Sequence, residues 1–214
     1  MSTPALVFDS VSKGFESGKT SVVALEAVSI SALPGKVTGL IGPDGAGKTT
    51  LMRLAVGLLL PDSGSIQVLG IDVLKAPLQV QSSVGYMPQR FGLYEDLSVM
   101  ENLDLYADLQ GVGREQRRAR YDELLQMTAL GPFTDRLAGR LSGGMKQKLG
   151  LACTLIKIPH LLLLDEPTVG VDPISRRELW AIIDRLVKQE GLSVLVSTAY
   201  LNETERCDEV VLLN

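Results

Sequence analysis

The stretch GPDGAGKT, from Gly42 to Thr49, constrains the fold of this chain more than any other part of the sequence. It matches the pattern G-x-x-x-x-G-K-[ST], follows the apolar run KVTGLIG, and opens a helix expected from about Lys48 to Leu58. Glycines let backbone N–H groups turn toward an anion, and a helix N-terminus adds partial positive charge. A glycine-rich turn with an incidental lysine is the alternative, but the strand–loop–helix context favours a cradle for a nucleoside triphosphate.

The side chains of this loop have separate expected tasks. Lys48 is expected to reach the β and γ phosphates, and the Thr49 hydroxyl to take one position around a Mg²⁺ ion. No N-K-x-D guanine-reading motif occurs in the sequence, so ATP is favoured over GTP. The predicted nucleotide-binding residues of the loop are Gly42, Pro43, Asp44, Gly45, Ala46, Gly47, Lys48, Thr49 and Thr50.

A second motif, LLLLDEP from Leu161 to Pro167, supplies two carboxylates. Its apolar residues predict a central strand of a doubly wound sheet, which would bring Asp165 to the sheet edge beside the phosphate loop. Asp165 is expected to hold Mg²⁺ directly or through water, and Glu166 to polarise the water that attacks the γ-phosphate. An acidic pair after a strand is often only a surface turn, but the upstream phosphate loop favours the catalytic interpretation.

Composition narrows the class of protein. The 214 residues, 45% of them hydrophobic, can bury a core in one domain, and a net charge of −4 argues against nucleic acid as a partner. Cys153 and Cys207 lie in predicted apolar helical contexts without CxxC spacing, which indicates reduced packing residues of a cytosolic protein. We find no secretory signal pattern and no apolar stretch long enough to cross a bilayer, so membrane association would require a partner.

The order of predicted elements is that of an α/β protein with a helical insert at about residues 89–140, between core segments 1–88 and 141–214. Strands are expected in ALVFD, VVALEAVSI, KVTGLIG, SIQVLG, SVGYM, LLLLD, LSVLVST and EVVLLN, with a turn at PDSG, Pro61–Gly64. Helices are expected after a capping box at Ser98, from Arg114 to Met127, from near Gly143, and from Asp172-Pro173 to Glu190.

The stretch RLSGGMKQKLGLACTLI, from Arg140 to Ile156, contains a second possible anion site. Ser142 and two glycines precede an amphipathic helix, so this helix start offers bare N–H groups and a hydroxyl. An SGG triplet alone would be an ordinary turn. Together, LSGGMKQ and the downstream DEPT resemble the signature of ATP-binding-cassette (ABC) proteins, and the resemblance covers essentially the whole chain, from Ala5 to Leu213.

The resemblance implies a particular fold and assembly. The fold would be that of an α/β P-loop NTPase with a RecA-like core, an antiparallel β subdomain and a helical signature subdomain. Two ABC ATPase domains would form a head-to-tail dimer, in which Asp172 of VGVDP lies at the seam and also caps a helix. The residues that would contact the partner domain's ATP are Leu141, Ser142, Gly143, Gly144 and Met145.

Two further site residues follow only from the resemblance. Gln89 in YMPQ would join Lys48 and Glu166 as a catalytic residue, by touching Mg²⁺ or the attacking water, and would link to the helical insert. Phe15 in VSKGF would stack on adenine. Without the resemblance, Gln89 would be a solvated loop residue and Phe15 could equally be a buried edge-strand residue.

A narrower resemblance concerns the stretch FGLYEDLSVMENL after Gln89, which is similar to the ATPase subunits of bacterial ABC-2 type exporters. More narrowly, the chain resembles the first of two tandem ATPase domains in such a subunit, which would make it a piece of a longer chain. Transmembrane permease subunits are then expected as partners at the cytoplasmic face of the membrane. They would dock in an apolar or mixed groove near Gln89 and Tyr94.

One position departs from the family pattern. The strand LSVLVST leads to Ala199, where the family usually has a histidine that contacts the γ-phosphate. His160, the only histidine, precedes LLLLD at the opposite end of a strand, and Tyr200 should project elsewhere. We therefore expect this site to bind ATP tightly and hydrolyse it slowly, while Ser142 assists a partner domain. Asp44 for the usual Asn, and TVGVD for TSGLD, also depart from the pattern at the dimer seam.

The resulting hypothesis is an ATPase that powers an ABC-type exporter. One alternative is a non-catalytic, regulatory half of an asymmetric pair, which Ala199 favours and Glu166 opposes. Another is a soluble ABC ATPase without a membrane partner, which would need basic linkers or coiled-coil arms. The basic run REQRRAR, Arg114 to Arg120, is interpreted as a solvated helix face, and Trp180 as packing against the sheet.

Overall fold

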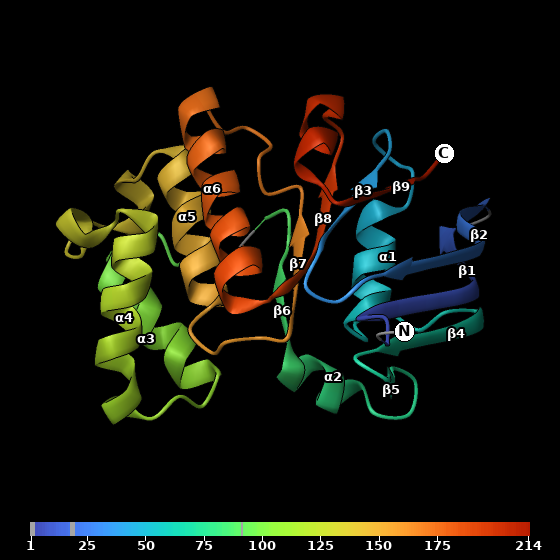
Figure 1. The fold of residues 1–214 in the computed structure, drawn as a ribbon, viewed down its shortest axis with the longest axis horizontal. Helices are drawn as coiled ribbons and strands as arrows, with labels where there is room; N and C mark the ends of the chain where they lie inside the picture. Colours follow the sequence, from blue (N-terminus) through green and yellow to red (C-terminus); the bar gives the residue numbers. More distant parts are fainter. Residues whose placement is uncertain (1–2, 18–19, 91) are drawn as a thin grey trace.

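The computed structural model describes residues 3–17, 20–90 and 92–214, and it contains two sheets with a helix between them (Figure 1). Phe91, the first residue of the FGLYEDLSVMENL stretch, lies outside the described residues. The described residues contain no helix that is both long enough and apolar enough for a membrane span.

The antiparallel sheet has the strand order β2-β1-β4-β5. Its strands are β1 (Leu6–Ser17), β2 (Thr20–Ala32), β4 (Ser63–Val68) and β5 (Ile71–Asp72). The turn predicted at PDSG is only half right, because Ser63 already pairs with Ser12 of β1. This sheet is the predicted β subdomain.

The parallel sheet has the order β6-β7-β8-β3-β9. Its strands are β3 (Val37–Ile41), β6 (Val84–Met87), β7 (Leu161–Asp165), β8 (Ser193–Thr198) and β9 (Glu209–Leu212). Every residue of β3, β7 and β8 is buried, as expected for parallel strands covered on both faces. Because the strands are parallel, the loops after β3, β7 and β8 meet at one edge of the sheet.

Helices cover both faces of the parallel sheet (Figure 1). Helix α1 (Lys48–Ala55) lies between the two sheets, and α5 (Gly143–Thr154) and α6 (Pro173–Glu190) cover the opposite face. Helices α3 (Val99–Leu109) and α4 (Arg114–Thr128) pack outside α5. Shorter segments are α2 (Pro77–Ser83) and the 3₁₀ turns η1 (Gly131–Phe133), η2 (Ala138–Arg140) and η3 (Leu201–Arg206).

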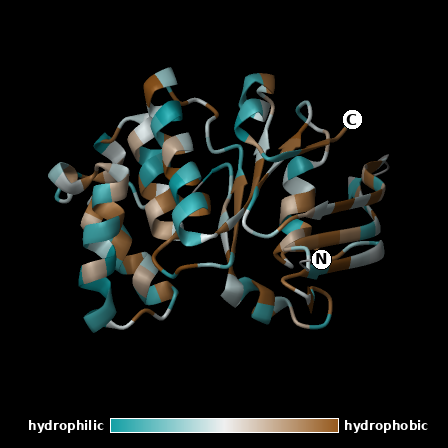
Figure 2. Cartoon of the chain, in the orientation of Figure 1, coloured by the Kyte–Doolittle hydropathy of each residue, from teal (hydrophilic) through white to brown (hydrophobic). Residues whose placement is uncertain are grey.

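The strand β7 divides the core between two clusters. Leu162 and Leu164 face α5 and α6, with Trp180 in the same cluster, whereas Leu161 and Leu163 face α1 and the antiparallel sheet. This alternation follows from the two-residue period of a strand. Figure 2 shows the apolar strands at the centre and hydrophilic residues on the outward faces of the helices.

Local sequence signals set most helix ends as predicted. Ser98 and Glu101 form the predicted capping box at the start of α3, and α6 has the predicted bounds. Helix α1 ends at Ala55, earlier than predicted, because Gly57 follows it with a positive φ of 67°. Helix α2 was not predicted, since only Val80 of its residues is buried and it has no apolar stripe.

Two sequence interpretations are wrong. Cys207 is not in a helix; it follows η3, and its Sγ would lie 2.7 Å from a Cβ added at Gly39. The run REQRRAR is not wholly a solvated face, because a helical period of 3.6 turns Arg117 and Arg120 inward.

The two inward arginines tie α4 to its neighbours: Arg117 to α3 within the insert, and Arg120 to the end of α5. Arg117 donates to Asp108 on α3 at 2.6 Å and to the carbonyl oxygen of Val112 at 2.7 Å. The buried Arg120 donates twice to the carbonyl oxygen of Leu155, at 2.6 and 3.0 Å, which caps the end of α5. These contacts satisfy backbone acceptors that helix and loop ends leave open.

Candidate nucleotide-binding site

A pocket of about 610 Å³ lies over the loop between β3 and α1, at the carboxyl edge of the parallel sheet. Gly47 has a φ of 88°, and an added Cβ would lie 2.6 Å from the carbonyl oxygen of Ala24, so this turn requires glycine. The lining contains most of the predicted site: Phe15, Ala24, Asp44, Gly45, Gly47, Lys48, Thr49, Thr50, Gln89, Glu166, Val169, Ala199 and Tyr200.

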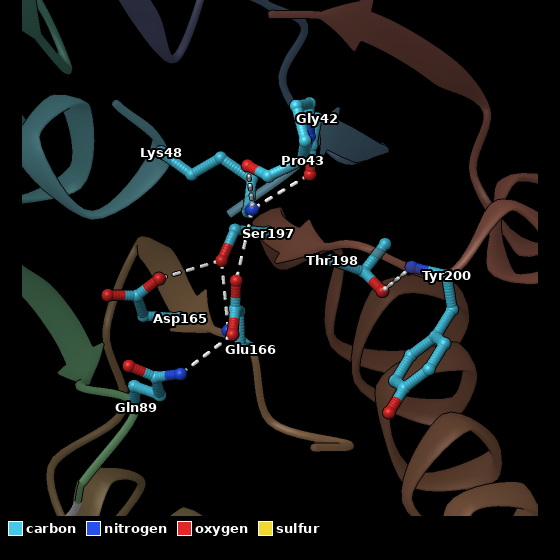
Figure 3. Close-up of polar contacts among 9 residues, drawn as sticks. All are labelled: Gly42, Pro43, Lys48, Gln89, Asp165, Glu166, Ser197, Thr198 and Tyr200. Atoms are coloured by element: carbon cyan, nitrogen blue, oxygen red, sulfur yellow. Dashed lines mark hydrogen bonds and ion pairs between the residues drawn. The ribbon is translucent and has the colours of Figure 1, made fainter. Parts of the chain in front are cut away.

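Lys48 places a buried ammonium group at the centre of the loop. Its Nζ donates to the carbonyl oxygens of Gly42 at 2.8 Å and Pro43 at 3.0 Å, and lies 3.1 Å from Oε1 of Glu166 (Figure 3). The side chains of this ion pair are only 4% and 8% exposed, so solvent screens them weakly. The positive charge therefore lies where the phosphates of a nucleotide are predicted.

Glu166 is held from two sides. Its Oε1 faces Lys48, and its Oε2 accepts a hydrogen bond from Nε2 of Gln89 at 2.8 Å. Its backbone has a φ of 50°, a conformation that costs a non-glycine residue about 1–3 kcal/mol and that concentrates at functional sites. The structure thus brings together the three predicted catalytic residues: Lys48 from the start of α1, Gln89 from the loop after β6 and Glu166 from the loop after β7.

The strand that carries Asp165 is not a neighbour of β3, because β8 lies between β7 and β3. Ser197, at the end of β8, fills this gap and was not predicted as a site residue. Its buried hydroxyl donates to Oδ1 of Asp165 at 2.7 Å and accepts from the backbone N–H of Glu166 at 2.9 Å. The available signal was a hydroxyl at the end of a buried strand, but the sequence did not reveal its partners.

The donor set is suited to Mg²⁺. Thr49, Asp165 and Gln89 offer hydroxyl, carboxylate and amide oxygens, which a hard divalent cation prefers. No cluster of three or more His, Cys, Asp or Glu residues able to hold a metal occurs in residues 3–17, 20–90 and 92–214. Mg²⁺ usually takes one or two protein carboxylates and completes its shell with phosphates and water, and Asp165 would be the carboxylate here.

Tyr86 lies on the other side of Asp165, with its hydroxyl 3.5 Å from Oδ2. Burial, and then the negative charge of Asp165, raise the pKa of Tyr86 above its ordinary value. The phenol therefore stays protonated at neutral pH and can donate to the carboxylate. Asp165 is thus oriented by two hydroxyl groups.

Phe15 lies on the pocket wall and is 39% exposed, so the interpretation as a buried edge-strand residue is wrong. The predicted partner-facing residues lie elsewhere, since none of Leu141 to Met145 lines the pocket. Ser142 caps α5 by accepting from the backbone N–H of Met145 at 3.2 Å, and it is exposed together with Gly143. Such an exposed helix start is available to another molecule.

The start of α6 packs against the start of α5. A Cβ added at Gly144 would overlap the side chain of Ser175, so glycine is required for this approach. Oδ1 of Asp172 accepts from the backbone N–H groups of Ile174 and Ser175, each at 3.0 Å, which confirms its capping role. Its place at a dimer seam remains a prediction.

Ala199 presents an exposed methyl group on the pocket wall. Thr198 is buried and accepts from the backbone N–H of Tyr200 at 3.0 Å, and the Tyr200 ring turns away from Lys48 (Figure 3). The guanidinium of Arg176 lies 4.4 Å from the centre of that ring. His160 precedes β7, at the end of the sheet opposite to the pocket. Its backbone N–H donates to the carbonyl oxygen of Ser83.

The family model described as ABC transporter matches residues 25–169. The chain belongs to the ABC transporter family. It is 63% identical over 180 residues to the probable multidrug ABC transporter ATP-binding protein YbhF of Escherichia coli strain K12, covering 84% of this chain and 31% of YbhF. It is 37% identical over 209 residues to the doxorubicin resistance ATP-binding protein DrrA of Mycobacterium tuberculosis strain H37Rv, covering 98% of this chain and 62% of DrrA.

Solved structures agree with this assignment. The ATP-binding cassette MJ0796, solved as a dimer in a post-hydrolysis state with ADP and Pi, matches with a TM-score of 0.88 and 25% identity. The match covers 98% of this chain and 94% of that chain. The fold is therefore that of an ABC ATPase domain, as predicted, although the chain spans about a third of YbhF and less than two thirds of DrrA.

Ser197 provides a first prediction for the site. Ser197→Ala removes the hydroxyl that orients Asp165 and accepts from Glu166, so ATP turnover should fall about tenfold while the Kd for ATP changes little. Steady-state hydrolysis and titration calorimetry measure the two effects. Ser193→Ala is the matched control, because Ser193 accepts from the N–H of Gly35 at the other end of the same strand. Equal effects of the two substitutions on turnover would refute the assignment.

Proposed function

We propose that this chain binds Mg²⁺-ATP at the Lys48 pocket, hydrolyses it, and powers an ABC-type exporter. The observation that carries the proposal is the position of the Glu166 carboxylate, which contacts both Lys48 of the phosphate loop and Gln89. Lys48 would exchange the carbonyls of Gly42 and Pro43 for phosphate oxygens when ATP binds. Glu166, freed from the ion pair, would then face the water that attacks the γ-phosphate.

The assembly would be a head-to-tail dimer with two unequal nucleotide sites. The exposed start of α5, with Ser142 at its cap, supports a role toward the nucleotide of a second ATPase domain. Ala199 supports slow ATP hydrolysis at the Lys48 pocket, because a methyl group can form a hydrogen bond neither to the attacking water nor to the phosphate. The partner domain would follow in tandem in a longer chain.

A groove of about 400 Å³ supports docking of a permease subunit. Neither Gln89 nor Tyr94 lines this groove, and Gln89 instead reaches Glu166 in the nucleotide pocket, so a docking surface near Gln89 and Tyr94 stays a separate prediction. The groove combines apolar and polar walls: Gln81, Ser82, Val84, Gly85, Tyr86, Tyr106, Leu109, Gln110, Thr154, Lys157, Ile158 and Pro159. It would hold a cytoplasmic helix of a membrane subunit, and the domain would then lie on the cytoplasmic face of the membrane.

Tyr86 connects the groove to the nucleotide pocket. It lines the groove, and its hydroxyl lies 3.5 Å from Asp165 at the predicted Mg²⁺ position. Leu109 and Ile158, which are 69% and 59% exposed, provide apolar surface at the groove. Movement of a docked helix would shift Tyr86, and through it Asp165 and the other residues expected around the γ-phosphate.

The second candidate function is a regulatory half that binds ATP without hydrolysing it, which Ala199 favours. The test is ATP hydrolysis and dimerisation of this domain alone and mixed with its tandem partner, with Glu166→Gln as a control. With the partner's own site inactivated, the proposal expects turnover in the mixture that falls when Glu166 is replaced. Turnover that is insensitive to Glu166→Gln would favour the regulatory function, and absence of ATP binding would contradict both.

A further inference from the structure

The strand that carries Phe15 is irregular just before that residue. The pairing of β1 with β2 shifts register between Val11 and Lys13 and again between Lys13 and Gly14. The pairing of β1 with β4 also shifts before Ser12. Such bulges break the ladder of hydrogen bonds and re-aim the side chains that follow. The pairing with β2 resumes at Gly14 and Phe15, so contacts from outside this ladder are needed at the bulge just before Phe15.

Asp62, in the turn before β4, supplies these missing contacts. Its Oδ2 accepts from the backbone N–H of Gly14 at 2.7 Å, and its Oδ1 accepts from Nζ of Lys13 at 2.7 Å. Its own N–H donates to the carbonyl oxygen of Ser12 at 2.9 Å. One residue thus holds three consecutive positions of β1, and the next position along the strand is Phe15 on the pocket wall.

Lys13 also acts on the Phe15 ring. Its Nζ lies 5.7 Å from the ring centre, within the range of a cation–π contact, and its side chain is only 16% exposed. Asp62 holds the ammonium at this position. Lys13 therefore covers one face of the ring and leaves the remaining surface of Phe15 to the pocket.

We propose that Asp62 and Lys13 are positioning residues for recognition of the nucleotide base, because together they fix the backbone and one face of Phe15 so that the base stacks on the other. This inference rests on the proposed function. Hydrogen bonds from Lys13 and then Gly14 lower the pKa of Asp62, so its carboxylate stays charged at neutral pH. Asp62 does not line the pocket around Lys48, so recognition of the triphosphate should not depend on Asp62.

The experiment compares Mg²⁺-ATP with Mg²⁺-tripolyphosphate, which has no base, by titration calorimetry. Asp62→Asn keeps the shape of the side chain and removes its charge, so the affinity for ATP should fall about three- to tenfold. The affinity for tripolyphosphate should stay unchanged. Lys13→Met should lower the ATP affinity in the same selective way, and Phe15→Ala should abolish the preference for ATP over tripolyphosphate.

Asp72→Asn is the matched control, since Asp72 also pairs with a lysine and accepts a backbone N–H in the same sheet, but lies outside the pocket. It should alter neither affinity. An Asp62→Asn effect equal for both ligands, or no effect, would overturn the inference. A Phe15→Ala variant with unchanged ATP preference would also overturn it while leaving ATP binding intact. If the unmodified domain binds neither ligand, the proposed function fails as well.

Discussion

Glu166→Gln is expected to lower ATP turnover by about 10²- to 10⁴-fold, the usual effect of removing a positioned general base, while ATP remains bound. Glutamine keeps the length of the side chain and can still contact Gln89, but it cannot accept a proton from water. The measurement is kcat for the domain paired with a partner whose own site is inactivated by the equivalent change of its catalytic glutamate, together with the Kd for Mg²⁺-ATP. We expect kcat to fall and the Kd to stay within a few-fold.

Glu190→Gln, at the exposed end of α6, is the control for loss of an acidic residue. Thermal unfolding of both variants separates catalysis from stability, because the Glu166 carboxylate is also paired with Lys48. A Glu166→Gln variant with normal turnover would show that another group activates the water. A variant that loses ATP binding as well would show that Glu166 acts in binding rather than in hydrolysis.

Ala199→His is expected to raise the turnover of the Lys48 site by about 10²-fold or more, because it adds a positioned acid/base and polar group at the pocket wall. Ala199 is exposed, so the new imidazole has room to enter the pocket. Turnover should be measured in the paired domain, with the partner's own site inactivated by the equivalent change of its catalytic glutamate. The Kd for ATP should change less than kcat.

Ala199→Phe adds a ring of similar size without a proton-transferring nitrogen and serves as the control for shape. It should leave turnover at or below the parental level. An increase with phenylalanine equal to that with histidine would attribute the effect to packing. No increase with histidine would show that position 199 does not limit the reaction, and would remove the proposed difference between the two sites.

The sequence was sufficient to predict the elements that depend on local signals. The phosphate loop between a buried strand and a helix, the capping box at Ser98 and the Asp172 cap of α6 are all confirmed. Each of these depends on residues close together in the chain, so their spacing alone determines the geometry. The family assignment is confirmed for the same reason, since its motifs are short and contiguous.

Features that depend on strand order or on long-range pairing were not predictable in this way. Ser197 contacts Asp165 because β8 pairs with β7 and sets these two residues opposite each other, and strand pairing is not a local property. Asp62 reaches Lys13 across 49 positions of the chain. Arg117 and Arg120 belong to a basic run, and burial of their side chains depends on where α4 packs.

The central claim is that Lys48, the surrounding loop and a divalent ion between Thr49 and Asp165 form one socket for a triphosphate. Titration calorimetry with Mg²⁺ and a non-hydrolysable ATP analogue tests it most directly, with Lys48→Ala as the comparison and circular dichroism as a check on folding. The account predicts saturable binding that requires Mg²⁺ and is lost in Lys48→Ala. Absence of binding by the folded, unmodified domain, or equal binding by Lys48→Ala, would contradict it.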